Sequence, residues 1–365
     1  MSASHPAGLT EQDVLLALKG VQDPDLKRDL VDLGMIKDIR ITDQLLELTV
    51  NLTTPACPLK GKIEADVREA IGRNLGNARE LRVNMSADVR GKGVIEKGDI
   101  PGVRNVIAVG SGKGGVGKST LAASLAYGLQ HYGSKVGLMD ADVYGPSVPH
   151  LVGASGRPMA KGERIQPIEA NGLKLMSIGF LVKPEQAVIM RGPMLHGIVN
   201  QFLHQVDWGE LDYLVIDLPP GTGDVPLTLS QTLPLTGAVV VCTPQEVALL
   251  DATRAVAMFR QLKVPLLGMV ENMSFLDPPG GGDRMYPFGH GGARRRAEEL
   301  DVPFLGEVPL VFDIREKGDI GLLHETLAEG SPSRPYLLGV VEALAQQISI
   351  RNLKAPRMPT LEIIS

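Results

Sequence analysis

Cysteine and aromatic residues are scarce in this sequence. Only two cysteines, Cys57 and Cys242, occur among 365 residues, and they stand far apart. Two sparse thiols exclude a disulfide framework and are typical of a protein in a reducing cytoplasm. Aromatic residues make up 4% of the chain and hydrophobic residues 44%, so we expect a core built on aliphatic side chains.

Long apolar runs and a strong excess of charge are also absent. No run approaches the roughly 20 apolar residues that a membrane-spanning helix needs. The N-terminus has neither the basic start nor the apolar stretch of a signal peptide. The formal net charge of −5 argues against a broad electrostatic surface for nucleic acid. We therefore expect a cytoplasmic protein that binds neither a membrane nor nucleic acid.

The first 90 residues have the pattern of a small α+β domain. Glu11–Gly20 has helical spacing after Thr10 as a possible N-cap. Met35–Ile41 and Leu45–Leu52 alternate as two strands, Pro58–Leu75 is expected to be a helix, and Glu80–Met85 a further strand. The expected order is therefore α-β-β-α-β.

The rest of the chain alternates short aliphatic runs with helical stretches. The runs are Val106–Val109, Val136–Met139, Tyr213–Ile216, Ala238–Val241 and Leu266–Val270. Such runs indicate strands buried on both faces, hence a mostly parallel sheet with helices on both faces, an α/β fold. We expect the small domain over 1–90, a linker rich in glycine and charge over 91–103, the α/β domain over 104–350 and an irregular tail over 351–365.

A glycine-rich loop follows the first of these strands. Residues 112–119 match G-x-x-x-x-G-K-[ST] at every fixed position, between a predicted strand and a predicted helix. Glycines let backbone N–H groups converge on phosphate oxygens, and the helix N-terminus adds partial positive charge. This predicts a P-loop NTPase that binds ATP through Gly112, Lys113, Gly114, Gly115, Val116, Gly117, Lys118, Ser119 and Thr120. We expect Lys118 to reach the β- and γ-phosphates, and the Ser119 hydroxyl to bind Mg²⁺.

Carboxylates end two of the other predicted strands. Asp217 follows four apolar residues in a Walker B pattern, and we expect it to contact Mg²⁺ through water. Asp140 and Asp142 follow the strand 136–139, where a carboxylate can position the attacking water or hold the metal. Asp140 has two interpretations, as a group that supports the site from behind its direct ligands or as a carboxylate that caps a helix. Asn272 follows the strand 266–270, and its amide offers a donor and an acceptor for a base.

Lys113, just after the first glycine of the loop, marks the deviant subclass of P-loop ATPases, the superfamily of the MinD and ParA proteins. Within it, the sequence resembles the Mrp/ApbC iron–sulfur cluster carriers over about residues 104–330. The resemblance rests on Gly112–Thr120, Asp140–Ser147, Arg191–Met194, Asp212–Asp224, Thr243–Val247, Glu271–Ser274 and Phe288–Gly292. It implies that Lys113 crosses a homodimer interface to the partner's nucleotide, that Asp142 orients the attacking water, and that Asn272 contacts adenine.

The first domain resembles the small SufT-like domain of iron–sulfur assembly factors. The matching segments are Asp23–Asp25, Leu33–Met35 and Thr53–Pro58. This resemblance implies apo iron–sulfur proteins and assembly factors as partners. The combined resemblance covers nearly the whole chain.

The sequence departs from the carriers at their usual C-x-x-C pair. Pro278 and Gly281 stand where the two cysteines would be, and neither can ligate iron. A cluster normally takes four thiolates, and a dimer of this chain offers two Cys57 and two Cys242. Cys57 precedes a predicted helix start, which favours a thiolate and makes it a candidate ligand. Cys242 ends a buried strand and is expected to be structural.

Three functions are compatible with this pattern. The first is an ATPase that binds a cluster and transfers it to apoproteins, with slow hydrolysis coupled to transfer. The second is a nucleotide-switched assembly adaptor that holds no cluster itself, which the missing C-x-x-C favours. The third is a positioning ATPase of the cell-division type, against which the absence of a basic amphipathic terminal helix counts.

Overall fold

The computed structural model describes residues 9–24, 26–76, 79–89, 91, 99–181, 192–278 and 280–354, with only the backbone of residues 192–196, 224, 225 and 229. The chain divides into two compact units, Met1–Arg90 and Gly91–Ser365. Within the described ranges, no helix is both long enough and apolar enough to cross a membrane.

The small unit has the predicted α-β-β-α-β order, with two additional short strands. Its elements are α1 (Glu11–Leu18), β1 (Gln22–Asp23), β2 (Arg28–Asp29), β3 (Ile36–Ile41), β4 (Leu45–Leu52), α2 (Lys60–Leu75) and β5 (Glu80–Ala87). Thr10 caps α1 through a capping box with Asp13. The sheet order is β3-β4-β5, antiparallel between β3 and β4 and parallel between β4 and β5, which the crossover helix α2 joins.

The core of the small unit follows from the two periodicities in its sequence. Every second residue of β4 is buried, so one face of the sheet is apolar. Ile63, Val67 and Ile71 recur at helical spacing on α2 and are also buried. The two-residue strands β1 and β2 were not predicted, because pairs this short carry no periodicity.

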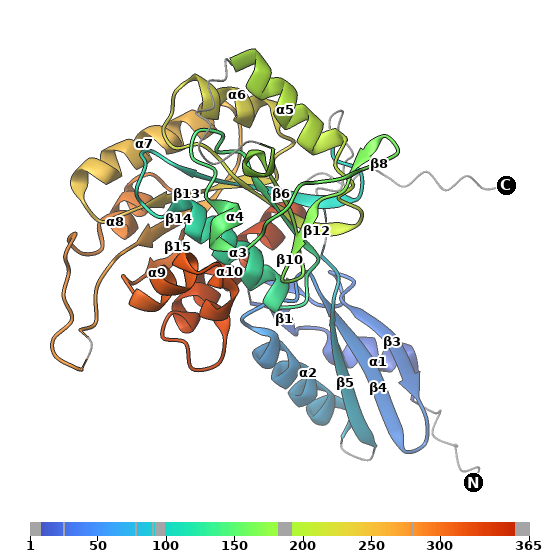
Figure 1. Ribbon diagram of the computed structural model, residues 1–365. Helices are drawn as coiled ribbons and strands as arrows, with labels where there is room; N and C mark the ends of the chain where they lie inside the picture. Colours follow the sequence, from blue (N-terminus) through green and yellow to red (C-terminus); the bar gives the residue numbers. More distant parts are fainter. Residues whose placement is uncertain are drawn as a thin grey trace, which may run out of the picture. The chain divides into compact units, whose positions relative to one another are not determined.

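The large unit is built on an eight-stranded sheet (Figure 1). The strand order is β10-β11-β7-β12-β6-β13-β14-β15, and only the edge strand β10 runs antiparallel. The elements are β6 (Val103–Ser111), α3 (Lys118–His131), β7 (Val136–Asp140), α4 (Val148–Leu151), β8 (Ala160–Lys161), β9 (Arg164–Ile165), β10 (Ile168–Ala170), β11 (Leu173–Ser177), η1 (Ile178–Phe180), α5 (Gly192–His204), β12 (Leu211–Asp217), α6 (Asp224–Thr232), β13 (Gly237–Cys242), α7 (Glu246–Gln261), β14 (Leu266–Asn272), α8 (Gly292–Glu299), β15 (Phe304–Val308), α9 (Phe312–Asp319), η2 (Leu323–Leu327) and α10 (Arg334–Lys354).

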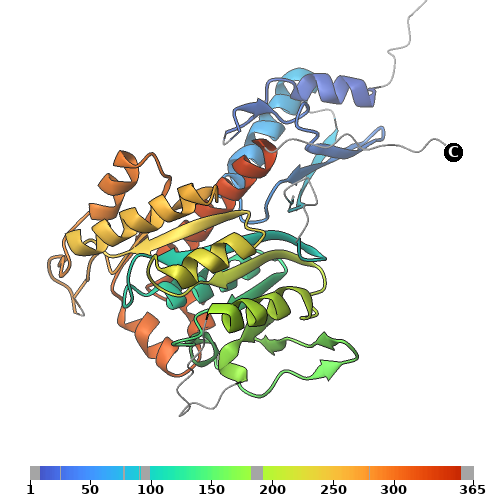
Figure 2. The same cartoon turned by 90° about the horizontal axis from the view of Figure 1, so that it is seen from above.

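Helices cover both faces of this sheet, as predicted. In Figure 1, α5, α6 and α7 lie above the strands, and α3, α9 and α10 lie below them. Figure 2 looks onto the upper face, across which α5 (yellow-green), α6 (yellow) and α7 (gold) run. All residues of β7 and β13 are buried, which explains why these strands are continuous aliphatic runs. The carboxyl ends of β6, β7, β12 and β14 consequently meet at one edge of the sheet.

Two predicted boundaries of the large domain differ from the structure. Strand β6 begins at Val103, the last residue of the predicted linker. The final helix α10 ends at Lys354, so the prediction of an irregular tail from residue 351 is wrong for its first four residues. Basic Arg351 and Lys354 in the last turn suit the negative end of the helix dipole, and Asn352 donates a hydrogen bond to Asn105 at 2.8 Å. Residues 355–365 lie outside the described residues.

Candidate functional site

The phosphate loop lies between β6 and α3, as the motif predicts. Gly117 immediately precedes α3 with φ +82°, a left-handed conformation that favours glycine. A Cβ at Gly117 would come within 2.2 Å of Asn272 Nδ2. The Asn272 amide also donates to the Val116 carbonyl at 2.8 Å. The predicted base-contacting residue is therefore packed directly against the phosphate loop.

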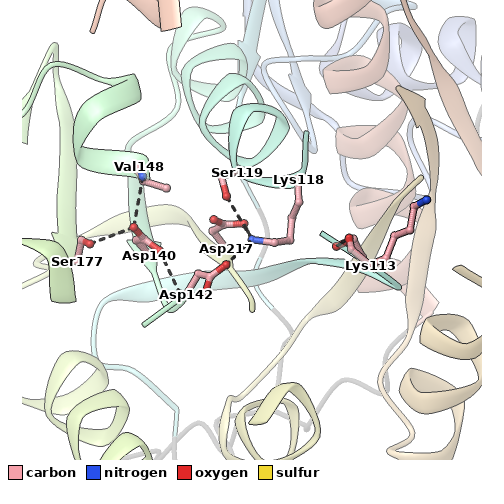
Figure 3. Close-up of polar contacts among 9 residues, drawn as sticks. Lys113, Lys118, Ser119, Asp140, Asp142, Val148, Ser177 and Asp217 are labelled. Carbon is pink, nitrogen blue, oxygen red and sulfur yellow. Dashed lines mark hydrogen bonds and ion pairs between the residues drawn. The ribbon is translucent and has the colours of Figure 1, made fainter. Parts of the chain in front are cut away.

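Lys118 joins the loop to two of the predicted carboxylates (Figure 3). Its Nζ lies 2.6 Å from Asp217 Oδ1, 3.6 Å from Asp142 Oδ2 and 3.2 Å from Ser119 Oγ. Lys118 is 6% exposed and Asp217 is fully buried. Such a pair persists in a protein interior because each charge compensates the other. The structure thus brings together four residues that stand up to 99 positions apart in sequence.

The Asp217 carboxylate has features that fit a divalent cation. Its Oδ2 atom is buried and has no hydrogen-bond partner among the residues described. Burial raises the pKa of the Asp217 carboxyl, and the Lys118 ammonium works against that rise. A buried carboxylate oxygen beside a serine hydroxyl is the kind of ligand pair that Mg²⁺ uses in nucleotide sites. The residues present therefore fit Mg²⁺, and Ser119 and Asp217 are the candidates to hold it.

Asp140 accepts hydrogen bonds from three segments. The Asp142 amide donates to Oδ1 at 3.1 Å, and the Val148 amide and the Ser177 hydroxyl donate to Oδ2 at 3.3 and 3.0 Å. Burial, and after it the neighbouring Asp217 carboxylate, raise the pKa of Asp140 to about 8. Of its two predicted interpretations, the structure favours a group that fixes the loop around Asp142. The bond to Val148 at the start of α4 shows that it also contacts a helix N-terminus.

A cavity of about 240 Å³ adjoins the loop on the side of Asn272. Gly117, Thr120 and Asn272 line one wall of this cavity. A second group of lining residues comes from the end of β15 and the start of α9, namely Val308, Pro309, Leu310, Val311, Ile314 and Arg315. An apolar cavity beside a phosphate loop suits a nucleotide base. This second group could not be predicted from the sequence, because its residues match no motif and reach the loop only through the fold.

Lys113 lies apart from this cluster. Figure 3 shows its side chain pointing away from Lys118 and from the three aspartates. Its main-chain carbonyl, by contrast, accepts a hydrogen bond from the Ser111 hydroxyl at 2.9 Å. The ammonium of Lys113 is therefore not directed at the cluster of Lys118 and the aspartates in its own chain (Figure 3).

A backbone hydrogen bond joins the two positions of the missing C-x-x-C pair. The Gly281 amide donates to the Pro278 carbonyl at 3.2 Å. Close by in sequence, Arg284 and Asp277 form a two-pronged ion pair, at 2.7 and 3.0 Å. Within the described residues, no three His, Cys, Asp or Glu side chains gather in a way that could hold a metal ion.

The two cysteines have different surroundings. Cys57 is half-buried in the small unit, where its carbonyl accepts from Lys60, the first residue of α2, at 3.3 Å. The helix begins two residues later than predicted, at Lys60. Cys242 is buried at the end of β13, and burial, with the neighbouring Glu271 carboxylate, raises the pKa of its thiol to about 12. Its surroundings are those of a structural residue.

Comparison with known proteins decides the family. Residues 102–345 match the family model described as NUBPL iron-transfer P-loop NTPase, and residues 11–84 match the model described as iron–sulfur cluster assembly protein. The chain belongs to the NUBPL iron-transfer P-loop NTPase family. The resemblance inferred from the loop motifs and from the small domain is thereby confirmed. Membership in this family also makes the chain a nucleotide-binding NTPase.

Relatives of this NTPase match it over nearly its whole length. It is 46% identical over 352 residues to the iron–sulfur cluster carrier protein of Synechocystis sp., covering 94% of this chain and 99% of that one. The carrier protein of Deinococcus radiodurans is 48% identical over 342 residues, with coverages of 93% and 96%. Both small and large units are therefore shared with proteins that bear this name.

Solved structures confirm the fold class of this NTPase. The nucleotide-binding protein of Archaeoglobus fulgidus, in complex with ADP, is 42% identical with a TM-score of 0.56, and covers 63% of this chain and 93% of its own. The cell division ATPase MinD of Pyrococcus furiosus has a TM-score of 0.50 at 21% identity, covering 66% and 97%. Since carriers and a cell-division ATPase share this fold, fold alone does not decide between the first and third predicted functions.

Proposed function

We propose that this NTPase hydrolyses ATP slowly, as a cytoplasmic homodimer, and couples hydrolysis to the transfer of an iron–sulfur cluster to apoproteins. The observation that carries the proposal is the match of both units, over 93% of the chain or more, to proteins named iron–sulfur cluster carriers. The large unit supports it with a phosphate loop, two acidic strand ends and an apolar cavity at one edge of the sheet.

The proposal assigns Lys118 two partners in turn. Without nucleotide, its ammonium compensates the buried Asp217 carboxylate at 2.6 Å. When phosphate enters the loop, the same ammonium turns to the phosphate oxygens, and Ser119 and Asp217 are free to hold Mg²⁺. The ion supplies positive charge for the phosphate oxygens. Nucleotide draws the Lys118 ammonium away from Asp217, and Mg²⁺ takes the place of that ammonium. Nucleotide and Mg²⁺ should therefore bind cooperatively.

Hydrolysis needs a water that is positioned to attack the γ-phosphate of ATP. It also needs positive charge that stabilises the γ-phosphate oxygens in the transition state. We assign the water to Asp142, whose Oδ2 lies 3.6 Å from Lys118 Nζ and whose amide is held by Asp140. We assign Lys113 to the nucleotide of the partner subunit, in the manner of an arginine finger. Its direction away from its own site supports this role (Figure 3). Turnover should therefore rise with protein concentration as dimers form.

We propose that the cluster, as cargo, binds at Cys57. Of the two thiols, only Cys57 is partly exposed, because Cys242 is buried in β13. Two copies of Cys57 in a dimer supply half of the usual four thiolates. The remaining positions would fall to the protein that delivers or receives the cluster, which suits a carrier that must release its cargo. Apo iron–sulfur proteins and assembly factors are the expected partners.

The hydrogen bond between Gly281 and Pro278 favours a second candidate function. The two positions that would carry cluster ligands are joined to each other by a backbone hydrogen bond instead. A nucleotide-switched adaptor that holds no cluster would need no ligands there. The two candidates differ in whether the purified chain takes up iron.

A transfer assay tests the proposed function. A cluster-loaded scaffold and an apo-ferredoxin are mixed with the chain, and holo-ferredoxin is followed by its visible absorbance with ATP, with a non-hydrolysable analogue and without nucleotide. We expect faster formation of holo-ferredoxin with ATP, and no acceleration with the Asp142→Asn variant. Equal rates under all three nucleotide conditions would rule out coupling of hydrolysis to transfer.

A further inference from the structure

Ser111 anchors the main chain of Lys113, the second lysine of the loop. It is the last residue of the central strand β6 and is 2% exposed. Its hydroxyl donates to the Lys113 carbonyl at 2.9 Å. The hydroxyl therefore bridges the rigid end of the sheet to a residue two positions further along the loop.

The main chain of Ser111 is held on two further sides. It pairs with Val241 of the neighbouring strand β13. Its carbonyl accepts a hydrogen bond from the Gly221 amide at 2.9 Å, within the loop that follows Asp217. Ser111 thus links the loop behind the predicted magnesium ligand to the carbonyl of Lys113. A displacement of the Gly221 loop would reach Lys113 through this residue.

The backbone of the next residue, Gly112, packs closely against a helix. A Cβ at Gly112 would lie 2.1 Å from the Asp251 carbonyl carbon on α7, so the backbone of Gly112 is in close contact with that helix. With Gly112 confined by α7, the Ser111 hydroxyl decides how the chain continues into Lys113. From this position the Lys113 side chain points away from Lys118 and the aspartates (Figure 3).

Anchoring the backbone matters more for Lys113 than for Lys118. The Lys118 ammonium is fixed by the two carboxylates that it contacts. A lysine that acts on another subunit has no such partner in its own chain, and its four-carbon side chain loses much conformational entropy on being ordered. Fixing its main chain beforehand reduces the number of conformations that must be lost when the transition state forms.

We propose that Ser111 is a positioning residue that sets the backbone of Lys113 for action on the partner's nucleotide. This inference rests on the proposed role of Lys113 in trans. Ser111 acts on the turnover number through Lys113 and leaves the binding of nucleotide to Lys118 and the loop amides. The role belongs to its hydroxyl, since its carbonyl and amide are retained by any residue at this position.

The test compares Ser111→Ala, Lys113→Ala and the double variant with the wild-type chain. Ser134→Ala is the matched control, because Ser134 is also buried and its hydroxyl has no hydrogen-bond partner among the residues described. For each protein, kcat and KM for ATP are measured over a range of protein concentrations, and the affinity for a fluorescent ATP analogue is measured separately. Ser111→Thr restores a hydroxyl on a side chain that suits a strand.

We expect Ser111→Ala to lower kcat about tenfold with nucleotide affinity within about twofold of wild type. On the Lys113→Ala background the same change should add nothing, because the two residues act as one unit. Ser111→Thr should recover kcat to within about threefold, and Ser134→Ala should match the wild type. If Ser111→Ala does not fold, Ser111→Cys replaces it, because a thiol fills the site but donates weakly.

Failure of the inference can be told apart from failure of the proposed function. An unchanged kcat in Lys113→Ala would refute the action of Lys113 in trans, whatever Ser111 does. A low kcat in Lys113→Ala with a normal kcat in Ser111→Ala would overturn the inference alone. Additive losses in the double variant, or a fall in nucleotide affinity equal to the fall in kcat, would also overturn it, because Ser111 would then act by another route.

Discussion

The ammonium nitrogen of Lys118 lies 2.6 Å from Oδ1 of the fully buried Asp217 carboxylate. This contact explains how the site stays folded without nucleotide. One cation compensates a carboxylate that would otherwise be desolvated without a partner. The contact also means that ligand binding must exchange partners around Asp217, so the unliganded site is set up for phosphate and metal together.

The two loop lysines should therefore differ in their effect on stability. Lys118→Ala removes the cation from the buried Asp217 and should lower the free energy of unfolding of the unliganded chain by about 3 kcal/mol. Lys113→Ala, at a half-buried position whose side chain points away from the carboxylates, should change it by less than about 0.5 kcal/mol. Urea denaturation of both variants provides the measurement. Equal losses would show that the Lys118–Asp217 pair does not stabilise the unliganded fold.

Asn272 should affect nucleotide selectivity more than hydrolysis. Its Nδ2 is engaged with the Val116 carbonyl, which fixes the amide beside the cavity. Asn272→Ala removes the polar group that would contact the base, and we expect a loss of ATP affinity of about tenfold. GTP affinity should change less, so the ratio of ATP affinity to GTP affinity should fall. Titrations with fluorescent ATP and GTP analogues measure both affinities, and a parallel loss of the two would exclude a role in base selection.

The protonation of Asp140 should make stability depend on pH. Its pKa is raised from 3.8 in the unfolded chain to about 8 in the folded one, so the folded state holds a proton that the unfolded state has lost. The stability that this group contributes is complete below pH 4 and is lost as pH rises through 8. Asp140→Asn cannot ionise, so its free energy of unfolding should fall less than that of the wild type between pH 5 and pH 8.5. Denaturant titrations across this range test the difference, and parallel profiles would contradict it.

The two thiols should react at different rates. Cys242 is buried with a pKa raised to about 12, whereas Cys57 is half-buried in a loop. Since the thiolate is the reactive form, iodoacetamide should alkylate Cys57 in the native chain and Cys242 only after unfolding. Mass spectrometry of differentially alkylated peptides measures this. Rapid native labelling of Cys242 would show that β13 opens and that its thiol is available as a ligand.

The phosphate loop could be predicted from the sequence because its ligands are contiguous. Lys118 and Ser119 stand at fixed positions in one motif, and the strand before them is a plain aliphatic run. Asp217 could be predicted because Walker B is also local. In each motif the functional residues stand next to one another in the sequence, so a short sequence pattern is enough to identify them.

Contacts between distant segments could not be predicted in the same way. The bond from Ser177 to Asp140 joins residues 37 positions apart, and the cavity wall at Pro309 is brought to Asn272 by the pairing of β14 with β15. No short pattern in the sequence contains both members of such a pair. The helical residues Arg351–Lys354 were missed for a related reason, since the Asn352 contact that supports them is made with the distant Asn105.

Reconstitution with iron and sulfide under anaerobic conditions tests the central claim most directly. Bound iron and visible absorbance are measured for the wild-type chain, for Cys57→Ser and for Cys242→Ala, with ATP binding as the control for folding. Dithiothreitol is present throughout, so that a small thiol can occupy the cluster positions that a partner protein would otherwise supply. The account predicts that the wild type and Cys242→Ala take up a cluster and that Cys57→Ser does not. If all three bind ATP and none binds iron, the chain is a nucleotide-switched adaptor, and cluster carriage by this chain is contradicted.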